Sequence, residues 1–368
     1  MNIPFLSFKQ MNADVKAELL PSFETFIDKG WYVLGEQVKK FEQEYAAWNT
    51  TSHCAGVANG LDALIIALKS LGIGEGDEVI VPSNTYIASW LAVSYVGAAP
   101  VPVEPRINTY NINPQLVEAA ITSKTKAIMP VHLYGQCCEM EAIMQLANKH
   151  NLYVVEDNAQ SQGAMYNGKL AGSFGHINGT SFYPGKNLGA YGDAGAITTN
   201  NQELFNKACT IRNYGSSQKY YNEIKGINSR LDEIQAGFLS IKLKHLSSWN
   251  TQRVHIAQLY HQLLSGTGDL ILPELASGAT SVFHLYVVRT LRRDALQQFL
   301  AEKGIGTLIH YPLPPHLQEA YKDLNYTTGD FPIAEEIANT CLSLPVYPGL
   351  SDDEINYISQ TIKAFYHA

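Results

Sequence analysis

The chain has little charge for its length and no excess of basic residues. Charged residues make up 16% of 368, and 34 Asp and Glu outnumber 26 Lys and Arg, which gives a net charge of -8. Proteins that bind nucleic acid or anionic membranes through phosphate groups need a concentrated positive field. The composition therefore argues against nucleic acid and membrane lipid as partners.

Long apolar runs and a secretion signal are also absent from the sequence. No uninterrupted apolar stretch approaches the roughly 18 residues that a membrane-spanning helix needs. Residues 1–9 lack the basic start and the following apolar stretch of a signal peptide. We therefore expect a cytoplasmic protein without a membrane span.

Cysteine is scarce, scattered and odd in number. A chain of this size can bury a core without covalent links, and no Cys or His pair has the spacing of a zinc site. We expect reduced thiols and no metal. The five cysteines are Cys54, Cys137, Cys138, Cys209 and Cys341.

The chain does contain a regular alternation of strand and helix patterns, with 46% apolar residues to bury. Short β-rich runs occupy residues 78–82, 100–103, 126–131 and 152–156, and helical spacing occupies 60–71, 86–96 and 140–150. This order predicts an α/β fold with a mostly parallel sheet that is flanked by helices on both faces. Ligands of such sheets bind at the carboxyl ends of the strands.

The second half of the chain predicts a smaller domain. A long helical pattern at 231–264 could cross between domains, and it is followed by a strand at 283–288 and helices at 294–303 and 352–366. A chain of this length favours a large domain with a smaller one. We expect a large domain at 1–245, whose N-terminal segment packs on the small domain, and a small C-terminal α/β domain at 246–368.

One lysine and one carboxylate occupy the ends of strand-like segments. Lys186 lies in the run Ser-Phe-Tyr-Pro-Gly-Lys-Asn-Leu-Gly, and Asp157 ends the apolar segment 152–156. Pyridoxal phosphate (PLP) chemistry requires an amine that forms a Schiff base and a carboxylate that keeps the pyridine nitrogen protonated. We assign Lys186 to the first role and Asp157 to the second.

Each of these two residues has a plainer explanation. A lysine after Pro-Gly is usually part of a surface turn, and an aspartate in this context could cap a helix. However, a buried carboxylate needs a cationic partner, which a protonated pyridine supplies. Phe182, Tyr183 and Tyr191 also surround Lys186 in sequence, and an aromatic lining favours its neutral amine. Considered together, Lys186 and Asp157 favour a PLP site over a surface turn and a helix cap.

A phosphate site is expected where a helix begins with glycine. Gly60 and Leu61 offer backbone N–H groups at such a start, and Ser181 is our candidate for a hydroxyl that adds to them. Tyr86 follows a predicted strand and could stack on the pyridine ring, although an aromatic in this position is more often part of the core.

These motifs together resemble the PLP-dependent nucleotide-sugar aminotransferases of the aspartate-aminotransferase fold, fold type I. The resemblance covers nearly the whole chain, from residues 30–35 through the Glu-Asp-x-Ala-Gln motif and the lysine motif to residues 228–236. It implies an aspartate-aminotransferase-like α/β fold and a homodimer with each active site at the subunit interface.

The resemblance also implies roles for single residues. Lys186 becomes the covalent lysine and proton shuttle, Asp157 the partner of the pyridine nitrogen, and Gln160 a neighbour of the cofactor phenolic oxygen. Asn228 would reach the phosphate from the partner chain and join the phosphate contacts Gly60, Leu61 and Ser181. Leu61 stands where the family usually has Thr or Ser, so the phosphate contacts could differ in detail.

Within this family the chain looks most like enzymes that aminate carbon 3 of dTDP-3-keto-6-deoxyhexoses. The implied donor is L-glutamate, which leaves as 2-oxoglutarate. The product is a dTDP-3-amino-3,6-dideoxyhexose, galacto or gluco, for surface polysaccharide such as lipopolysaccharide O-antigen, or for glycosides. The expected substrate contacts are Tyr183, Tyr214, Lys219, Tyr221, His310, Tyr311 and His316.

Other functions remain open at this point. An aminotransferase acting at carbon 4 of a nucleotide sugar would share the fold and the cofactor. A sugar dehydratase is disfavoured because those relatives replace the lysine by histidine. A non-catalytic regulator that keeps the fold is the third alternative, although no DNA-binding module or basic face accompanies it.

Overall fold

The first half of the chain forms a parallel sheet. In the computed structural model, which describes residues 1–367, the strand order is β3-β2-β4-β5 and all three pairings are parallel. This confirms the mostly parallel α/β sheet that the sequence predicts. The strands are β2 (Glu78–Pro82), β3 (Ala99–Val103), β4 (Thr125–Ile128) and β5 (Tyr153–Val154).

A second group of strands continues this sheet. β1 (His53–Val57), β9 (Gly195–Thr199) and β8 (Asn178–Ser181) pair antiparallel in the order β1-β9-β8. A parallel bridge between Asp157 and Gly179 joins β8 to the chain that leaves β5. Asp157 therefore lies at the junction of the two groups of strands.

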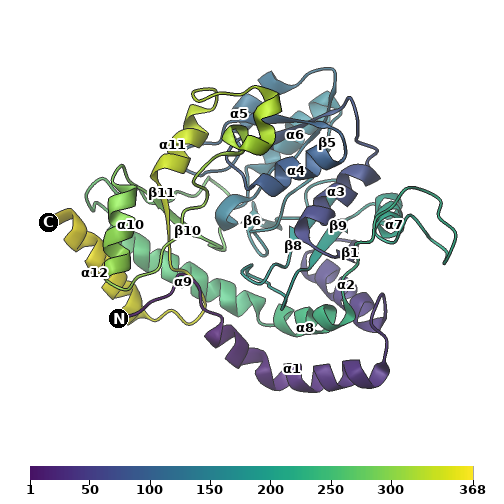
Figure 1. Cartoon of the computed structure of the whole chain (residues 1–368), viewed down its shortest axis with the longest axis horizontal. Coiled ribbons are helices and arrows are strands. Elements are labelled where there is room, and N and C mark those ends of the chain that lie inside the picture. The colour runs from purple at the N-terminus through teal and green to yellow at the C-terminus, as the bar shows by residue number, and fades with distance from the viewer. Residues whose placement is uncertain (368) are drawn as a thin grey trace.

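Helices cover this sheet and follow the predicted positions closely (Figure 1). The predicted helices at 60–71, 86–96 and 140–150 are confirmed within one residue at each end. The helices before the second half are α1 (Lys9–Lys29), α2 (Glu36–Trp48), α3 (Gly60–Ser70), α4 (Ile87–Tyr95), α5 (Pro114–Val117), η1 (Glu118–Ala120), η2 (Leu133–Gly135), α6 (Met140–His150) and α7 (Gln202–Ile211).

The long helix predicted at 231–264 is wrong, because the chain breaks it into α8 (Glu233–Leu243) and α9 (Leu246–Leu264). The break lies where α1 packs beside α8 along the edge of the molecule (Figure 1). There the Glu18 carboxylate accepts hydrogen bonds from Lys244 Nζ at 3.3 Å and His245 Nε2 at 3.1 Å. The apolar periodicity of residues 231–264 contains no information about contacts with α1, so it could not predict this break.

The C-terminal residues build a separate core around a two-stranded sheet. β10 (Tyr286–Arg289) pairs antiparallel with β11 (Cys341–Leu344), so the strand predicted from residue 283 begins three residues later. Ile3 joins this core and exchanges hydrogen bonds with Gly304 and Gly306, both at 2.8 Å. We propose a domain boundary at the junction of α8 and α9, near residue 245.

The remaining elements lie around these two cores. They are β6 (Met165–Tyr166), β7 (Lys169–Leu170), α10 (Arg293–Glu302), η3 (Pro315–Leu317), η4 (Glu319–Leu324), α11 (Pro332–Thr340) and α12 (Asp352–His367). Within residues 1–367, no helix has the length and hydropathy needed to cross a membrane, and no three His, Cys, Asp or Glu side chains gather as a metal site. All five cysteines are free thiols.

The Glu233 carboxylate ties the start of α8 to the start of α2. It is 3% exposed and accepts the backbone N–H groups of Gly35, Gln37 and Val38 at 2.6, 3.0 and 3.0 Å. The first N–H groups of a helix have no partner inside the helix, so this carboxylate serves as the cap of α2. The motif Leu-Asp-Glu-Ile-Gln thus has a structural role.

We predict that Glu233→Ala lowers the free energy of unfolding by about 2 to 4 kcal/mol, because it leaves buried N–H groups without acceptors. Denaturant titration of the protein measures this loss. Glu319→Ala is the control, since its side chain is 83% exposed and pairs only with Lys322 at the surface; it should change stability by less than about 0.5 kcal/mol. Equal losses in both variants would refute the capping role.

Candidate active site

Lys186 lies in a turn that follows β8. Its backbone N–H donates to the Tyr183 carbonyl at 2.8 Å, and its side chain is half-buried. Burial lowers the pKa of Lys186 to about 8, although the negative charge of Asp157 acts to raise it. The amine can therefore become neutral near physiological pH, as a nucleophile must.

Asp157 lies at the carboxyl end of β5 and is 5% exposed. Oδ2 accepts from Ser89 Oγ of α4 at 2.8 Å, and Oδ1 accepts from the Ala159 N–H at 3.1 Å. Burial raises the pKa of Asp157, whereas the Ser89 and Ala159 hydrogen bonds and the charge of Lys186 lower it. No helix begins at this residue, so the capping explanation is excluded. A buried carboxylate in this position suits a cationic ligand.

A second buried lysine provides a contrast. Burial lowers the pKa of Lys242 to about 8 as well. Its Nζ, however, donates to the Gly189 carbonyl at 2.7 Å and lies 3.6 Å from the centre of the Tyr191 ring. Because a hydrogen bond and an aromatic ring engage this amine, Lys242 has a structural role, whereas the charge of Asp157 acts on Lys186.

The start of α3 forms a cradle for an anion. Asn59 caps the helix by accepting the Asp62 N–H at 2.8 Å, and the N–H groups of Gly60 and Leu61 have no acceptor inside the helix by their position. A Cβ on Gly60 would lie 2.6 Å from Ser181 Cβ, so only glycine allows this close approach. The residues present thus fit a phosphate held by N–H groups beside a hydroxyl.

Tyr86, Gln160 and Tyr311 form a group of aromatic and amide side chains, joined through Tyr311. Tyr86 immediately precedes α4 and is 52% exposed, so it is not a core residue, and its ring centre lies 5.1 Å from that of Tyr311. Gln160 Oε1 accepts the Tyr134 N–H at 2.7 Å, and Nε2 donates to the Tyr311 hydroxyl at 3.2 Å. Tyr311 therefore brings the C-terminal part of the chain to the end of β5.

Two of the aromatic neighbours of Lys186 in sequence, Phe182 and Tyr191, have partners from other parts of the chain. Phe182 is fully buried and packs edge-on against Phe41 and Tyr45. Tyr191 donates to Asn12 Oδ1 at 2.9 Å and lies over Lys242. These partners lie elsewhere in the fold, so an aromatic lining of Lys186 by Phe182 and Tyr191 stays a prediction, and burial lowers the pKa of Lys186.

The charge of Lys186 acts on two of the three histidines considered for this site, His284 and His310. Burial and the charge of Lys186 lower the pKa of His310 to about 4, and its Nδ1 lies 2.8 Å from Ser343 Oγ of β11. Burial, and then the charge of Lys186, lower the pKa of His284 well below its ordinary value, although no sequence motif pointed to this residue. His316 is 1% exposed and its Nε2 lies 3.0 Å from Glu335, so its substrate contact stays a prediction.

Tyr214, Lys219 and Tyr221, three more of the predicted substrate residues, lie on an exposed loop between α7 and α8, which projects from the molecule (Figure 1). Tyr214 and Tyr221 are 51% and 65% exposed. Asn228 is also exposed, whereas its neighbour Ser229 is buried and accepts the Ala58 N–H at 3.1 Å. Arg230, which the sequence reasoning missed, lies over the Tyr214 ring. The roles of this loop and of the exposed Tyr183 and Lys219 stay predictions.

Comparisons with known proteins agree with this geometry. The model of the DegT/DnrJ/EryC1/StrS aminotransferase family matches residues 13–363. A relative from Aneurinibacillus thermoaerophilus, dTDP-3-amino-3,6-dideoxy-alpha-D-galactopyranose transaminase, is 51% identical over 99% of both chains. The crystal structure of Streptomyces venezuelae DesV with a bound reaction intermediate has a TM-score of 0.98, with 47% identity over 100% of this chain and 99% of that one. Bacillus subtilis NtdA with bound pyridoxamine phosphate has a TM-score of 0.93, with 31% identity over 100% and 86%.

We predict that Gly60→Ala weakens PLP binding by at least about tenfold, because the new Cβ displaces Ser181 from the start of α3. Fluorescence titration of the cofactor-free protein with PLP measures the affinity. Gly74→Ala is the matched control, since its added Cβ meets nothing nearer than the Val96 carbonyl at 3.4 Å. Unchanged affinity in Gly60→Ala would remove the phosphate from this cradle.

Proposed function

Because this chain belongs to the DegT/DnrJ/EryC1/StrS aminotransferase family, we propose that it transfers an amino group from L-glutamate to carbon 3 of a dTDP-3-keto-6-deoxyhexose. The chain is a PLP-dependent sugar aminotransferase. The 51% identity to a dTDP-3-amino-sugar transaminase over the full chain supports carbon 3 as the position and a galacto product as the first choice.

The placement of Asp157 and Lys186 around one junction, where Asp157 bridges Gly179 of β8 and Lys186 follows β8, is the observation that carries this function. The amine has its pKa lowered to about 8, and the carboxylate is buried with a raised pKa at the end of β5. The α3 cradle offers two N–H groups and the Ser181 hydroxyl to an anion. Lys186 matches the aldehyde of PLP, Asp157 matches the ring nitrogen, and the α3 cradle matches the phosphate.

When bound, PLP supplies a carbonyl that reacts with amines and a ring that withdraws electrons from the attached carbon. Lys186 Nζ would take a proton from the donor carbon and return it to the acceptor in the second half of the reaction. Asp157 would hold the ring nitrogen in its protonated form, and Gln160 would orient the ring from its Nε2. Tyr86 and Tyr311 would exclude water from one side of the site.

We expect the purified protein to convert dTDP-3-keto-6-deoxyglucose or its galacto isomer, with L-glutamate, to a sugar whose amine is on carbon 3. Proton NMR of the product identifies the position. Lys186→Ala should lower the rate by at least about a thousandfold, since the same amine bonds the cofactor and moves the proton.

The outcome also separates the alternatives. An amine on carbon 4 would favour the 4-aminotransferase. A protein that binds PLP but converts no sugar would favour the non-catalytic regulator.

We propose further that the protein acts as a homodimer whose subunits share each active site. Exposed apolar side chains along α1 and the chain that follows it support this, since a monomer would leave them in water. They include Leu20, Phe23, Ile27, Trp31, Tyr32 and Val33, which are 41% to 64% exposed. The exposed Asn228 would then reach the phosphate in the partner's α3 cradle.

Complementation tests this shared site. Lys186→Ala and Asn228→Asp proteins should each be inactive or severely impaired, because the second places a negative charge beside the phosphate. After mixed refolding, hybrid dimers contain one site with both native residues, so about a quarter of the wild-type activity should return. Recovery is measured as product formed per mole of dimer. Failure to recover activity in verified hybrids would place Asn228 in its own subunit's site.

The location and the use of the product are proposals as well. We propose a cytoplasmic enzyme, as the sequence predicts. A sugar bound to a nucleoside diphosphate is an activated donor, so the reaction that consumes the product would be a glycosyl transfer. Surface polysaccharide, such as lipopolysaccharide O-antigen, or a glycoside would receive the amino sugar.

A further inference from the structure

Asp157 is held by two hydrogen bonds, one to each oxygen of its carboxylate. Ser89 Oγ of α4 donates to Oδ2 at 2.8 Å, and the Ala159 N–H donates to Oδ1 at 3.1 Å. Ser89 and Asp157 are both buried, and a hydrogen bond to a charged group is strong where water is excluded. Each carboxylate oxygen can accept about two hydrogen bonds, so both keep room for a further donor.

The direction of the Ser89 bond follows from the chemistry of the groups. An ionised carboxylate only accepts hydrogen bonds, so the single Ser89 hydroxyl proton points to Asp157. Thr85 Oγ1 lies 3.1 Å from Ser89 Oγ, and either of these hydroxyls could donate by distance alone. Because the Ser89 proton is already used, Thr85 must donate and Ser89 must accept. The three side chains therefore form a chain of hydrogen bonds that ends on Oδ2 of Asp157.

The contact between Thr85 and Ser89 spans the start of α4, where Tyr86 lies. Tyr86 is the N-cap of this helix, and its own side chain does not cap the helix. Thr85 precedes it directly, and Ser89 follows it by three residues in the first turn. One hydrogen-bonded unit thus joins the residue predicted to stack on the PLP ring to the residue predicted to pair with the ring nitrogen.

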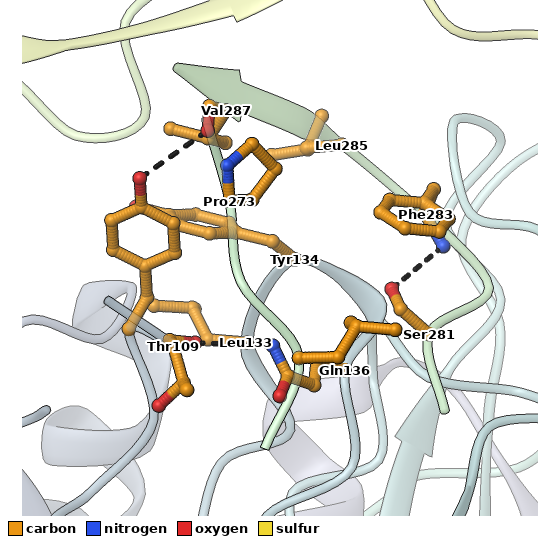
Figure 2. Close-up of a pocket in the computed structure, with 11 residues that line it drawn as sticks. Thr109, Leu133, Tyr134, Gln136, Pro273, Ser281, Phe283, Leu285 and Val287 are labelled. Carbon is orange, nitrogen blue, oxygen red and sulfur yellow. Dashed lines mark hydrogen bonds between the residues drawn. The ribbon is translucent and has the colours of Figure 1, made fainter. Parts of the chain in front are cut away.

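The segment before α4 is held from two sides. Trp90 Nε1 donates to the Pro82 carbonyl at 3.0 Å. Asn84 Nδ2 donates to the Tyr110 carbonyl at 2.8 Å, and the Tyr110 hydroxyl donates to the Val287 carbonyl of β10 at 3.3 Å. Figure 2 marks this last bond at Val287, beside a cavity of about 10 Å³ that is too small for a ligand larger than one water molecule. The start of α4 is therefore tied to both β2 and β10.

We propose that Ser89 is a positioning residue that, oriented by Thr85, holds Oδ2 of Asp157 and so fixes the carboxylate where the PLP ring nitrogen binds. This inference rests on the proposed role of Asp157. Ser89 acts through the carboxylate and not on the cofactor itself. The acceptor positions of Asp157 that the protein leaves open are then available to the N–H of the ring.

Several groups act on the charge of Asp157. Burial raises the pKa of Asp157, and the hydrogen bond from Ser89 is the largest of the effects that lower it. A backbone N–H bond and the charges of Lys186, which follows β8, and of His132, which precedes η2, also lower this pKa. Asp157 in turn helps to raise the pKa of Tyr311, after burial.

The loss of the Ser89 hydroxyl has a definite sign. It removes a hydrogen bond that favours the ionised carboxylate, so the pKa of Asp157 should rise. A variant that merely loosened the packing would let water in, reduce the cost of burying the charge and lower the pKa of Asp157. Positioning and simple packing therefore predict shifts in opposite directions.

The first test measures the pKa of Asp157 in full-length protein freed of PLP. Carbon NMR with ¹³Cγ-aspartate, assigned by the signal lost in Asp157→Asn, follows the titration of this carboxyl group. In Ser89→Ala the midpoint should lie about one to two pH units above that of the wild type, as expected for one hydrogen bond to a charged group. An unchanged or lower midpoint would overturn the proposal.

Two further variants serve as controls for this titration. Ser89→Thr keeps the hydroxyl and should return the midpoint to the wild-type value; a midpoint like that of Ser89→Ala would exclude the hydroxyl as the cause and overturn the proposal. Ser70→Ala is the matched control, since Ser70 is equally buried and donates to the Ile66 carbonyl of its own helix α3 at 2.7 Å. It should leave the midpoint unchanged, and an equal shift there would also overturn the proposal.

The second test uses protein loaded with ¹⁵N-labelled PLP, in which nitrogen NMR reports the protonation of the ring. The pKa of the ring nitrogen should fall by at least about one pH unit in Ser89→Ala, because a displaced carboxylate holds that proton less well. A ring nitrogen that titrates as in the wild type would overturn the positioning role. The proposed role of Asp157 fails separately if Asp157→Asn leaves the ring nitrogen unchanged, whereas the titration without PLP stands even if no sugar is aminated.

Discussion

The attraction between the Lys186 ammonium and the Asp157 carboxylate, set against the cost of burying both, is the constraint on which the site depends. Either charge alone in this place would be unfavourable, and neither is fully satisfied by the other. Burial pulls the lysine towards its neutral form and the aspartate towards its protonated form. A cofactor with an amine-reactive carbonyl and a protonated ring nitrogen resolves both problems at once.

The fold places these two residues by strand pairing. Asp157 leaves β5 and bridges Gly179 of β8, and Lys186 follows β8 by a short turn. The neighbouring start of α3 faces Ser181, the last residue of β8. Amine, carboxylate and anion cradle therefore all lie around one junction in the sheet, and the C-terminal part of the chain closes it through Tyr311 and His310.

Local patterns explain which features could be predicted from the sequence. Lys186, Asp157 and Gly60 lie at the ends of strands and the start of a helix, where apolar runs and glycine mark the boundaries. The helices at 60–71, 86–96 and 140–150 were predicted for the same reason. Features that depend on distant contacts could not be found this way. The break between α8 and α9 lies where Glu18 of α1 contacts Lys244 and His245, and the contact of His284 with Asn187 joins residues 97 apart in the chain.

Borohydride reduction of the purified protein tests the central claim most directly, because it makes the bond between lysine and cofactor permanent. The account predicts one pyridoxyl phosphate group per chain, on the peptide that contains Lys186. Label on Lys242, whose pKa is lowered to the same range, or on any other lysine, would contradict the account. So would an unlabelled Lys186 in protein that still carries out transamination.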